Sequence, residues 1–595
     1  MDFSGDGLIN FAVAGTVKGE ARDAEGNLLP DRVLNSGRIQ ANGGQVTLSA
    51  RDAGDVIRNV VNHEGVIEAK TVARREGRVF LMGGGKGTVN VAGTIDASGT
   101  NAGEKGGTVH VLGEKVGLFG NGRIDVSGDS GGGTALIGGD YQGGGGVPAA
   151  TATFLGDGAL IRADALTAGD GGKVIVWADH TTRAYGAISA RGGNISGNGG
   201  LVETSGKIFL DVSRTPDVTS AHGRGGLWLL DPNDLEIVAG SGSANIFNGA
   251  PFFTTTNDTA QIGVDLITSA LTGGASVTIA TGTSGSNAQS GDITVSAPID
   301  YNGKGTNSLG LSAHRHIVIN DNIYDSDASG DRLNISLFAD SAAGGTGTIT
   351  VAAGKTVATG GGALSLSAAD VDLQGTLNSG AARTSIFVSD GGTVGLGSGA
   401  CAHIAGGCGM TLSGAELQNI STSGGLNIGS SANGAVHVDG ITSADSANIG
   451  AASLFTGSNI SFRNAASSFL KLTAFAFNGI SVATDLSATG AGSAGSMILN
   501  ADGDNNQSGA FTQSAGTTMS AGGDIVLTGA SIATDGTVTP GSGFVVARSL
   551  TGGTTTVVTT SSGETIAVPT GQALNQAINS TFVTAFIQPG RIPGC

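Results

Sequence analysis

One segment of the chain contains a complete repeat and predicts the fold. Residues 93–126 read GTIDASGTNAGEKGGTVHVLGEKVGLFGNGRIDV, and the opening GTIDA returns at the end as GRIDV. Each copy is a short apolar strand behind a glycine. Between them lies GGTVHV, at residues 106–111, where polar and apolar residues alternate with the period of a strand that has one buried face. One repeat therefore contains at least two short strands joined by glycine turns.

The same two strand types recur on both sides of this segment. The leading glycines of the first type are separated by 28, 28, 29, 36 and 28 residues. Two or three short strands in a period of about 28 residues are typical of one coil of a parallel β-solenoid. We therefore predict an all-β, right-handed parallel β-helix. The first type begins at Gly37, Gly65, Gly93, Gly122, Gly158 and Gly186, and the second type occupies residues 43–48, 76–81, 106–111, 171–176 and 199–204.

Composition agrees with short strands and many turns. The chain has 595 residues, of which 106 are Gly and only 10 are Pro, and glycine has no period of three, which excludes collagen. With 39% hydrophobic and 13% charged residues, the chain also lacks the signature of general disorder.

The second half keeps the strands but loosens the period. We predict a regular β-helix over residues 1–240, an irregular break over 241–270 that contains a short helix at 261–271, and a less regular β-solenoid with looser coils over 271–595. Strands of this second region are expected at residues 292–296, 316–320, 333–337, 348–351, 364–367 and 524–528.

Charge and cysteine content restrict the partners. The formal net charge is -18, from 30 Lys and Arg against 48 Asp and Glu, so nucleic acid and anionic membrane surfaces are not expected as partners. No stretch reaches the ~20 apolar residues of a transmembrane helix. Three cysteines cannot form a disulfide framework, although Cys401 and Cys408 are close enough in sequence to close a small loop, and Cys595 is left over.

Six blocks of sequence resemble the filamentous haemagglutinin family of two-partner secretion adhesins, most strongly within residues 1–240. They are residues 2–9 (DFSGDGLI), 138–143 (GGDYQG), 174–179 (VIVWAD), 190–193 (ARGG), 202–207 (VETSGK) and 228–235 (WLLDPNDL).

The resemblance implies a fragment of a large bacterial protein that is secreted to the cell surface and stays associated with the outer membrane. Its implied partners are an outer-membrane two-partner secretion transporter, for the full-length protein, and a surface glycan or protein of a host or a bacterium. The family's signal peptide and secretion cap are not found, because Met1–Gly7 carries acidic residues where a signal peptide is basic and then apolar. Export of this chain as it stands is therefore doubtful.

Two other function classes remain open. One is the shaft of a contact-dependent growth inhibition toxin, which requires a compact carboxyl-terminal effector, whereas residues 540–595 continue with Gly, Thr and Val. The other is a β-helix enzyme that degrades polysaccharides, which requires Asp, Lys and Arg at equivalent positions of successive coils. The charges are scattered, so we expect no enzyme, no catalytic, metal or cofactor-binding residues and no cofactor.

Several short motifs that resemble chemical sites are interpreted as structural. Gly128–Gly132 (GDSGG) matches a serine nucleophile elbow, but no helix is expected after Ser130, and His222 follows the serine at a distance. His314 and His316 are a potential metal pair on one strand face but lack a third ligand, so we expect solvated strand residues. Turns are expected at Asp502–Asn506, which begins like a calcium loop, and at Gly354–Thr356, which ends like a phosphate loop. Trp177 and Trp228 lie in apolar strands, which favours packing over recognition.

Overall fold

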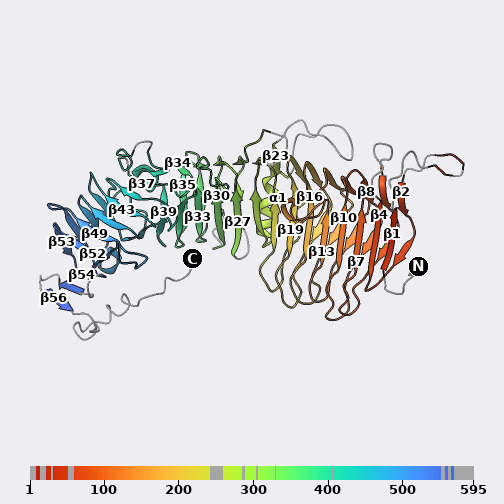
Figure 1. Cartoon of the computed structure of the whole chain (residues 1–595), viewed down its shortest axis with the longest axis horizontal. Coiled ribbons are helices and arrows are strands. Elements are labelled where there is room, and N and C mark those ends of the chain that lie inside the picture. The colour runs from red at the N-terminus through yellow and green to blue at the C-terminus, as the bar shows by residue number, and fades with distance from the viewer. Residues whose placement is uncertain are drawn as a thin grey trace. The chain divides into compact units, whose positions relative to one another are not determined.

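The computed structural model describes residues 8–13, 22–23, 25–27, 31–50, 59–241, 259–283, 288–302, 306–327, 330–397, 399–404, 407–550, 556–560 and 565–568. It is an all-β parallel β-helix, as the repeat predicts (Figure 1). Two compact units divide the chain: unit 1 consists of residues 1–342 and 355–361, and unit 2 of residues 343–354 and 362–595. Both described flanks of the expected break at 241–270 lie inside unit 1.

Each coil in the first part of unit 1 contributes one strand to each of three parallel sheets. The first sheet contains β1 (Leu8–Val13), β4 (Gln45–Ala50), β7 (Arg78–Met82), β10 (Thr108–Leu112), β13 (Thr134–Ile137), β16 (Lys173–Ala178), β19 (Leu201–Gly206), β21 (Leu227–Leu230), β24 (Ser276–Ala280), β27 (Thr306–Ser312) and β30 (Arg332–Phe338). The second contains β2 (Asp31–Asn35), β5 (Asn59–His63), β8 (Thr88–Val91), β11 (Lys115–Leu118), β14 (Ala152–Leu155), β17 (Thr181–Ala184) and β20 (Phe209–Val212). The third contains β3 (Arg38–Gln40), β6 (Val66–Glu68), β9 (Thr94–Asp96), β12 (Arg123–Asp125), β15 (Leu160–Arg162) and β18 (Ala187–Ser189).

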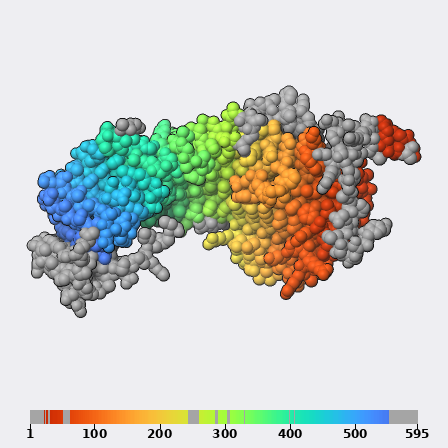
Figure 2. Space-filling model, in the orientation of Figure 1, coloured from red at the N-terminus to blue at the C-terminus, as the bar shows by residue number. Residues whose placement is uncertain are grey.

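The third sheet is the first predicted strand type, copy for copy. Its central isoleucines are in register and form one inward column, which is buried from β6 to β18, whereas Ile39 of β3 is half-buried. Burying one such side chain contributes roughly 1.5–3 kcal/mol, so a column of them favours this register strongly. Within unit 1 the surface colour changes in successive bands from red to yellow, as stacked coils require (Figure 2). The column contains Ile67, Ile95, Ile124, Ile161 and Ile188.

Alternation also explains the first sheet. In β4 every second residue is buried, and its inward Val46 is in register with Val79 of β7, which in turn is in register with Val109 of β10. The second sheet was not recognised as a strand family. Its strands share neither a leading glycine nor a common pattern, as KVGL in β11 and TTRA in β17 show.

Near the predicted break, strands pair in parallel but not in their sequence order. The strand β23 (Ala260–Gly263) pairs in parallel with β22 (Leu235–Val238), which also pairs with β25 (Ile293–Val295). The helix α1 (Val264–Thr272) follows directly, so the expected helix starts three residues later than Gln261 because Ala260–Gly263 is held as a strand. Val264, Leu266, Ile267, Ala270 and Leu271 form the buried face of α1. The central part of the break, residues 242–258, lies outside the described residues.

The later coils of unit 1 add two further strand groups. One continues from β25 to β28 (Ile317–Ile319), and the other contains β26 (Ile299–Asp300), β29 (Ile323–Tyr324) and β32 (Thr356–Ala358). A short 3-10 helix, η1 (Tyr141–Gly143), lies between β13 and β14.

Unit 2 is built from strands of the same kind. Its first sheet contains β33 (Leu364–Ala368), β36 (Thr384–Val388), β40 (Leu426–Ile428), β42 (Ala452–Thr456), β45 (Leu472–Ala476), β48 (Met497–Asn500), β51 (Ile525–Gly529) and β54 (Phe544–Ser549), followed by antiparallel β55 (Thr556–Thr560) and β56 (Thr565–Val568). Its second sheet contains β37 (Val394–Leu396), β38 (Met410–Leu412), β41 (Val436–Val438), β43 (Asn459–Phe462), β46 (Gly479–Val482), β49 (Ala510–Gln513) and β52 (Ser531–Thr534), while β31 (Thr348–Val351) and β34 (Asp370–Leu373) pair with each other in a separate sheet. The third group contains β35 (Thr376–Gly380), β39 (Ile420–Thr422), β44 (Ser467–Phe469), β47 (Leu486–Ala488), β50 (Thr518–Ala521) and β53 (Thr537–Pro540), and the short helices are α2 (Gly414–Gln418) and η2 (Gly492–Gly495).

All six strands expected in the second region are present, as β25, β28, β30, β31, β33 and β51. The end of the expected region, residues 569–595, lies outside the described residues, and so does Cys595. Within the described residues, no helix combines the length and the apolar character that crossing a bilayer requires.

Candidate interaction surface

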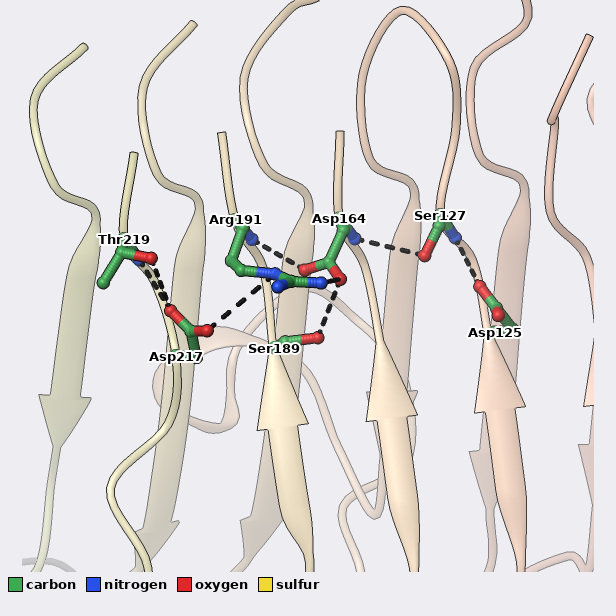
Figure 3. Close-up of polar contacts among 7 residues, drawn as sticks. All are labelled: Asp125, Ser127, Asp164, Ser189, Arg191, Asp217 and Thr219. Carbon is green, nitrogen blue, oxygen red and sulfur yellow. Dashed lines mark hydrogen bonds and ion pairs between the residues drawn. The ribbon is translucent and has the colours of Figure 1, made fainter. Parts of the chain in front are cut away.

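A ladder of polar side chains follows the carboxyl ends of the strands in the third sheet of unit 1 (Figure 3). Coil after coil places a polar residue at the end of the strand and another two residues later. In three coils these are Asp and then Ser or Thr, and the backbone N–H of the second residue donates to the Asp carboxylate at 3.0–3.1 Å. This is the turn that Asp forms with its own backbone. The three pairs are Asp96 and Ser98, Asp125 and Ser127, and Asp217 and Thr219.

In the two coils that contain Asp164 and Arg191, charged side chains replace this pattern and connect neighbouring coils. Asp164 is almost fully buried and accepts from the backbone N–H and the Nη2 of Arg191, both at 2.8 Å, and from the hydroxyl of Ser189. Arg191 also places its Nε 3.8 Å from Oδ2 of Asp217 in the following coil. One guanidinium therefore connects three consecutive coils.

The ladder fixes coil register. Its contacts form only when the strands are aligned, and a slip by one residue would turn every side chain to the opposite face. Exposure increases from Asp164, with 3% of its side chain exposed, to Arg191 and Asp217, with 49% and 46%. The side of the ladder near Arg191 and Asp217 is thus open to solvent, while the Asp164 side is closed.

A second cluster lies on the outer face of the first sheet, under a segment that covers it. We call it the covered tryptophan cluster, and it consists of Trp177, Glu203, Lys207 and Asp231 beneath the cover segment, residues 138–151. Gly139 and Gly143 lie flat on the indole of Trp177, since a Cβ added at either would come within 2.6 Å of a ring atom. The glycine-rich sequence of the cover segment is therefore explained by this close approach.

Charges and hydrogen bonds hold the cover segment in place. Nζ of Lys173 lies 2.5 Å from Oδ1 of Asp140 in the cover segment. Beneath the segment, the indole N–H of Trp177 donates to Asp179 at 3.0 Å, which orients the ring. Gln142 adopts the left-handed conformation, with φ of 50°, and its N–H points at both carboxylate oxygens of Glu203, 3.1 and 3.2 Å away.

Glu203 is the most perturbed carboxyl of this cluster. It points outward from β19, in register with Ile175 on one side and Leu229 on the other, and it is completely buried. Burial raises the pKa of Glu203 to about 7, although the hydrogen bond from Gln142 opposes the shift.

Asp231 and Lys207 complete the cluster. Burial raises the pKa of Asp231 to about 6, and Lys207, with Nζ 3.9 Å from Oδ2, lowers it in turn. The same ammonium lies 5.2 Å from the centre of the Trp177 ring, within the range of a cation–π contact.

Five of the six blocks that carry the family resemblance meet at these two places. Residues 138–143, 174–179, 202–207 and 228–235 supply the cover segment and the covered tryptophan cluster, and residues 190–193 supply Arg191 of the ladder. Sequence reasoning noticed the blocks but missed Glu203 and Arg191 as individual residues. The sequence does contain a signal for Glu203: it is an acidic residue at an outward position, and the equivalent residues of the adjacent repeats, Ile175 and Leu229, are apolar.

The serine motif is part of a turn stack beside the ladder. The hydroxyl of Ser130 donates to the carbonyl of Gly103 at 3.0 Å, and the carboxylate of Asp129 accepts the N–H of Gly103. The strand β13 follows, where an elbow requires a helix. His222 lies in the corresponding turn three coils later, on the order of 14 Å away at ~4.8 Å per coil.

The other motifs are placed as follows. His314 and His316 precede β28 and lie in a turn, so the expectation that they are strand residues is wrong; Asp292 holds the turn by accepting from Arg315 and from the N–H of His316. Gly354 and Lys355 lie in the expected turn, which ends where β32 begins at Thr356, and Lys355 is paired to Asp321 at 2.8 Å. Asp502–Asn506 is also the expected turn.

Within that second turn, Asp502 accepts the N–H groups of Asn506 and Gln507 at 3.0 and 2.9 Å. Both tryptophans are fully buried, as expected: Trp228 points into the core of the solenoid and donates to Thr204, whereas Trp177 is buried on the outer face by the cover segment. Cys401 and Cys408 form the disulfide that their spacing allows.

Comparison with models of known protein families gives no match for this chain, and a search of curated proteins finds none either.

Proposed function

We propose that the chain is a fragment of a large secreted, surface-associated bacterial adhesin of the filamentous haemagglutinin type, a structural and binding protein exported by two-partner secretion. The observation that carries the proposal is the convergence of the resembling blocks. Blocks that are up to about 90 residues apart in sequence, at 138–143 and 228–235, supply one buried cluster on one coil face. Blocks that resembled the family only in composition would not need to pack together, whereas blocks that share its fold and function would.

Two further observations support it. The Cys401–Cys408 disulfide is a bond that persists outside the reducing cytosol. The regular ladder holds the coils in fixed register and leaves Arg191 and Asp217 open to solvent, which suits a shaft whose side offers repeated weak contacts.

The test is made in the organism that carries the gene. Intact cells are treated with a protease that does not enter them, and the chain is followed by an antibody against residues 60–240. A surface adhesin is degraded under these conditions, while a cytosolic control protein is not. Deletion of the gene should reduce attachment to host cells or to other bacteria. Full protection of the chain on intact cells would contradict export.

The deletion strain tests one alternative and the purified chain tests the other. A toxin shaft predicts that the strain loses the ability to inhibit neighbouring cells in mixed culture, with attachment unchanged. A polysaccharide-degrading β-helix predicts that the purified chain releases reducing ends from acidic polysaccharides.

A further inference from the structure

The outer face of the second sheet in unit 2 carries a compact group of basic side chains. In the described residues, Gly395 of β37, His437 of β41 and Ser461 of β43 are in register and form one outward column. Nδ1 of His437 lies 2.6 Å from the hydroxyl of Ser461. Arg463 follows β43 directly, and its backbone N–H continues the ladder to the carbonyl of Val438 at 3.0 Å, so the alternation that places Ser461 outward also places Arg463 outward.

The disulfide brings a second histidine to this column. A Cβ at Gly395 would lie 2.1 Å from Sγ of Cys401 and 3.2 Å from Sγ of Cys408, so the disulfide rests directly on the bare backbone of Gly395. The short loop that it closes contains His403, whose ring centre is 4.6 Å from that of His437 in an edge-to-face arrangement. His403 is thus held at the column by a covalent clamp.

The guanidinium of Arg463 has an unused hydrogen-bond donor in the described residues. Nε of Arg463 is buried and has no hydrogen-bond partner within the described part of the chain. The nearby carboxylate of Asp439 is already engaged, because it accepts from Nδ2 of Asn464 at 2.7 Å and from the N–H of Ala465 at 2.9 Å. Burial, His403 and Arg463 together lower the pKa of His437 to about 4, which means that the surroundings of this imidazole repel a proton.

We propose that His403, His437 and Arg463 form a binding site for a small carboxylate, for which glucuronate is the probe. A guanidinium fork matches the geometry of a carboxylate, and the neutral imidazole of His437 adds an N–H donor. A metal ion is disfavoured because Arg463 offers no acceptor and carries a positive charge. The site is independent of the proposed function, since it requires neither export nor attachment.

The experiment is a titration of the intact, oxidised chain with glucuronate, and glucose serves as the probe that lacks the carboxylate. The chain has eight histidines, and selective labelling of their rings allows each to be followed by NMR; the His437→Gln variant assigns the signal of interest. Glucuronate should shift the His437 signal with a saturable dependence and a Kd on the order of 1 mM. Because binding and protonation are linked, bound glucuronate should also raise the pKa of His437. Absence of a saturable shift, or an equal shift with glucose, would overturn the site.

Two variants separate the contributions. Arg463→Gln should raise the pKa of His437 in the free protein, because a repelling charge is removed, while glucuronate binding falls at least tenfold. The Cys401→Ser, Cys408→Ser double variant releases His403 and should have the same pair of effects in weaker form. Arg383→Gln, at an exposed arginine elsewhere in unit 2, is the matched control and should change neither quantity. If Arg463→Gln leaves glucuronate binding unchanged, the assignment of the site is wrong.

Discussion

Unit 1 and unit 2 stack coils of different kinds. In unit 1 the register steps between neighbouring strands of the first sheet are long, as from Lys173 to Leu201 and from Thr134 to Lys173, and the additional residues form turns that carry the ladder and the cover segment. In unit 2 some steps are only 20 residues, as from Leu364 to Thr384 and from Ala452 to Leu472. Coils this short leave few residues for polar turns, and the disulfide-closed loop between β37 and β38 is an exception.

The two units differ in which side chains fix the register of their coils. Unit 1 adds to its inward isoleucine column two sets of side chains outside the core, namely the ladder and the covered tryptophan cluster. Unit 2 relies on inward columns such as Leu454 and Ala474, which are in register and buried. Substitutions on the outer face should therefore destabilise unit 1 more than unit 2.

The largest effect is expected from Trp177→Ala. The indole fills the space beneath Gly139 and Gly143, and its removal leaves a cavity that costs roughly 3–5 kcal/mol. Hydrogen exchange followed by mass spectrometry should show loss of protection in residues 138–206 and none in residues 452–500. Ile195→Ala, at a side chain that is 68% exposed, is the control and should change protection in neither region.

A smaller and pH-dependent effect is expected from Glu203→Gln. The pKa of Glu203 is about 7 in the folded chain against an ordinary 4.5, so the folded state binds the proton more tightly than the unfolded state. The free energy of unfolding should then rise as pH falls from 7 to 4.5, by about 3 kcal/mol from this group. The variant removes that dependence and stabilises unit 1 by about 3 kcal/mol at pH 8, where Glu203 is ionised in both states.

Denaturant unfolding followed by tryptophan fluorescence measures this, because both tryptophans of the chain, Trp177 and Trp228, belong to unit 1. The exposed Glu76→Gln variant is the comparison and should keep the pH dependence of the unmodified chain. An unchanged slope between pH 4.5 and 7 in Glu203→Gln would show that Glu203 titrates in its ordinary range.

The smallest effect is expected in the ladder. Asp164→Asn weakens the charge-assisted bonds to Arg191 at a nearly buried site and should cost about 1–2 kcal/mol. Asp157→Asn, at a carboxylate that is 83% exposed in its pair with Arg214, should cost less than about 0.5 kcal/mol. Equal losses in the same unfolding experiment would mean that the ladder contributes no more than an ordinary surface ion pair.

The repeat predicted the fold because its inward residues are identical in kind. The isoleucines of the third sheet and the glycines before them recur with a nearly constant period, and a column of equivalent side chains is what a solenoid core requires. The repeat does not predict the second sheet, because the inward residues of this sheet vary in type, from Val116 to Ala184, and its strands lack a common turn.

The sites were harder to predict for a physical reason. Glu203 and Gln142 are 61 residues apart and meet only because the cover segment folds back over the neighbouring coils. His403 and His437 meet only because the disulfide closes a loop onto Gly395. Contacts of this kind depend on the path of irregular segments, which the period of the repeat does not encode.

The register of the third sheet can be tested directly with paired cysteines. In the described coils, Arg123 is in register with Leu160, and Arg162 lies two residues further along the same neighbouring strand. Neighbouring parallel strands are ~4.8 Å apart, within reach of a disulfide, whereas the offset of two residues places the Cα atoms roughly 8 Å apart, beyond it. The Arg123→Cys, Leu160→Cys variant should therefore form the cross-linked peptide under mild oxidation, and the Arg123→Cys, Arg162→Cys variant should not. Efficient cross-linking of the offset pair, with none in the aligned pair, would contradict the parallel β-helix in this register.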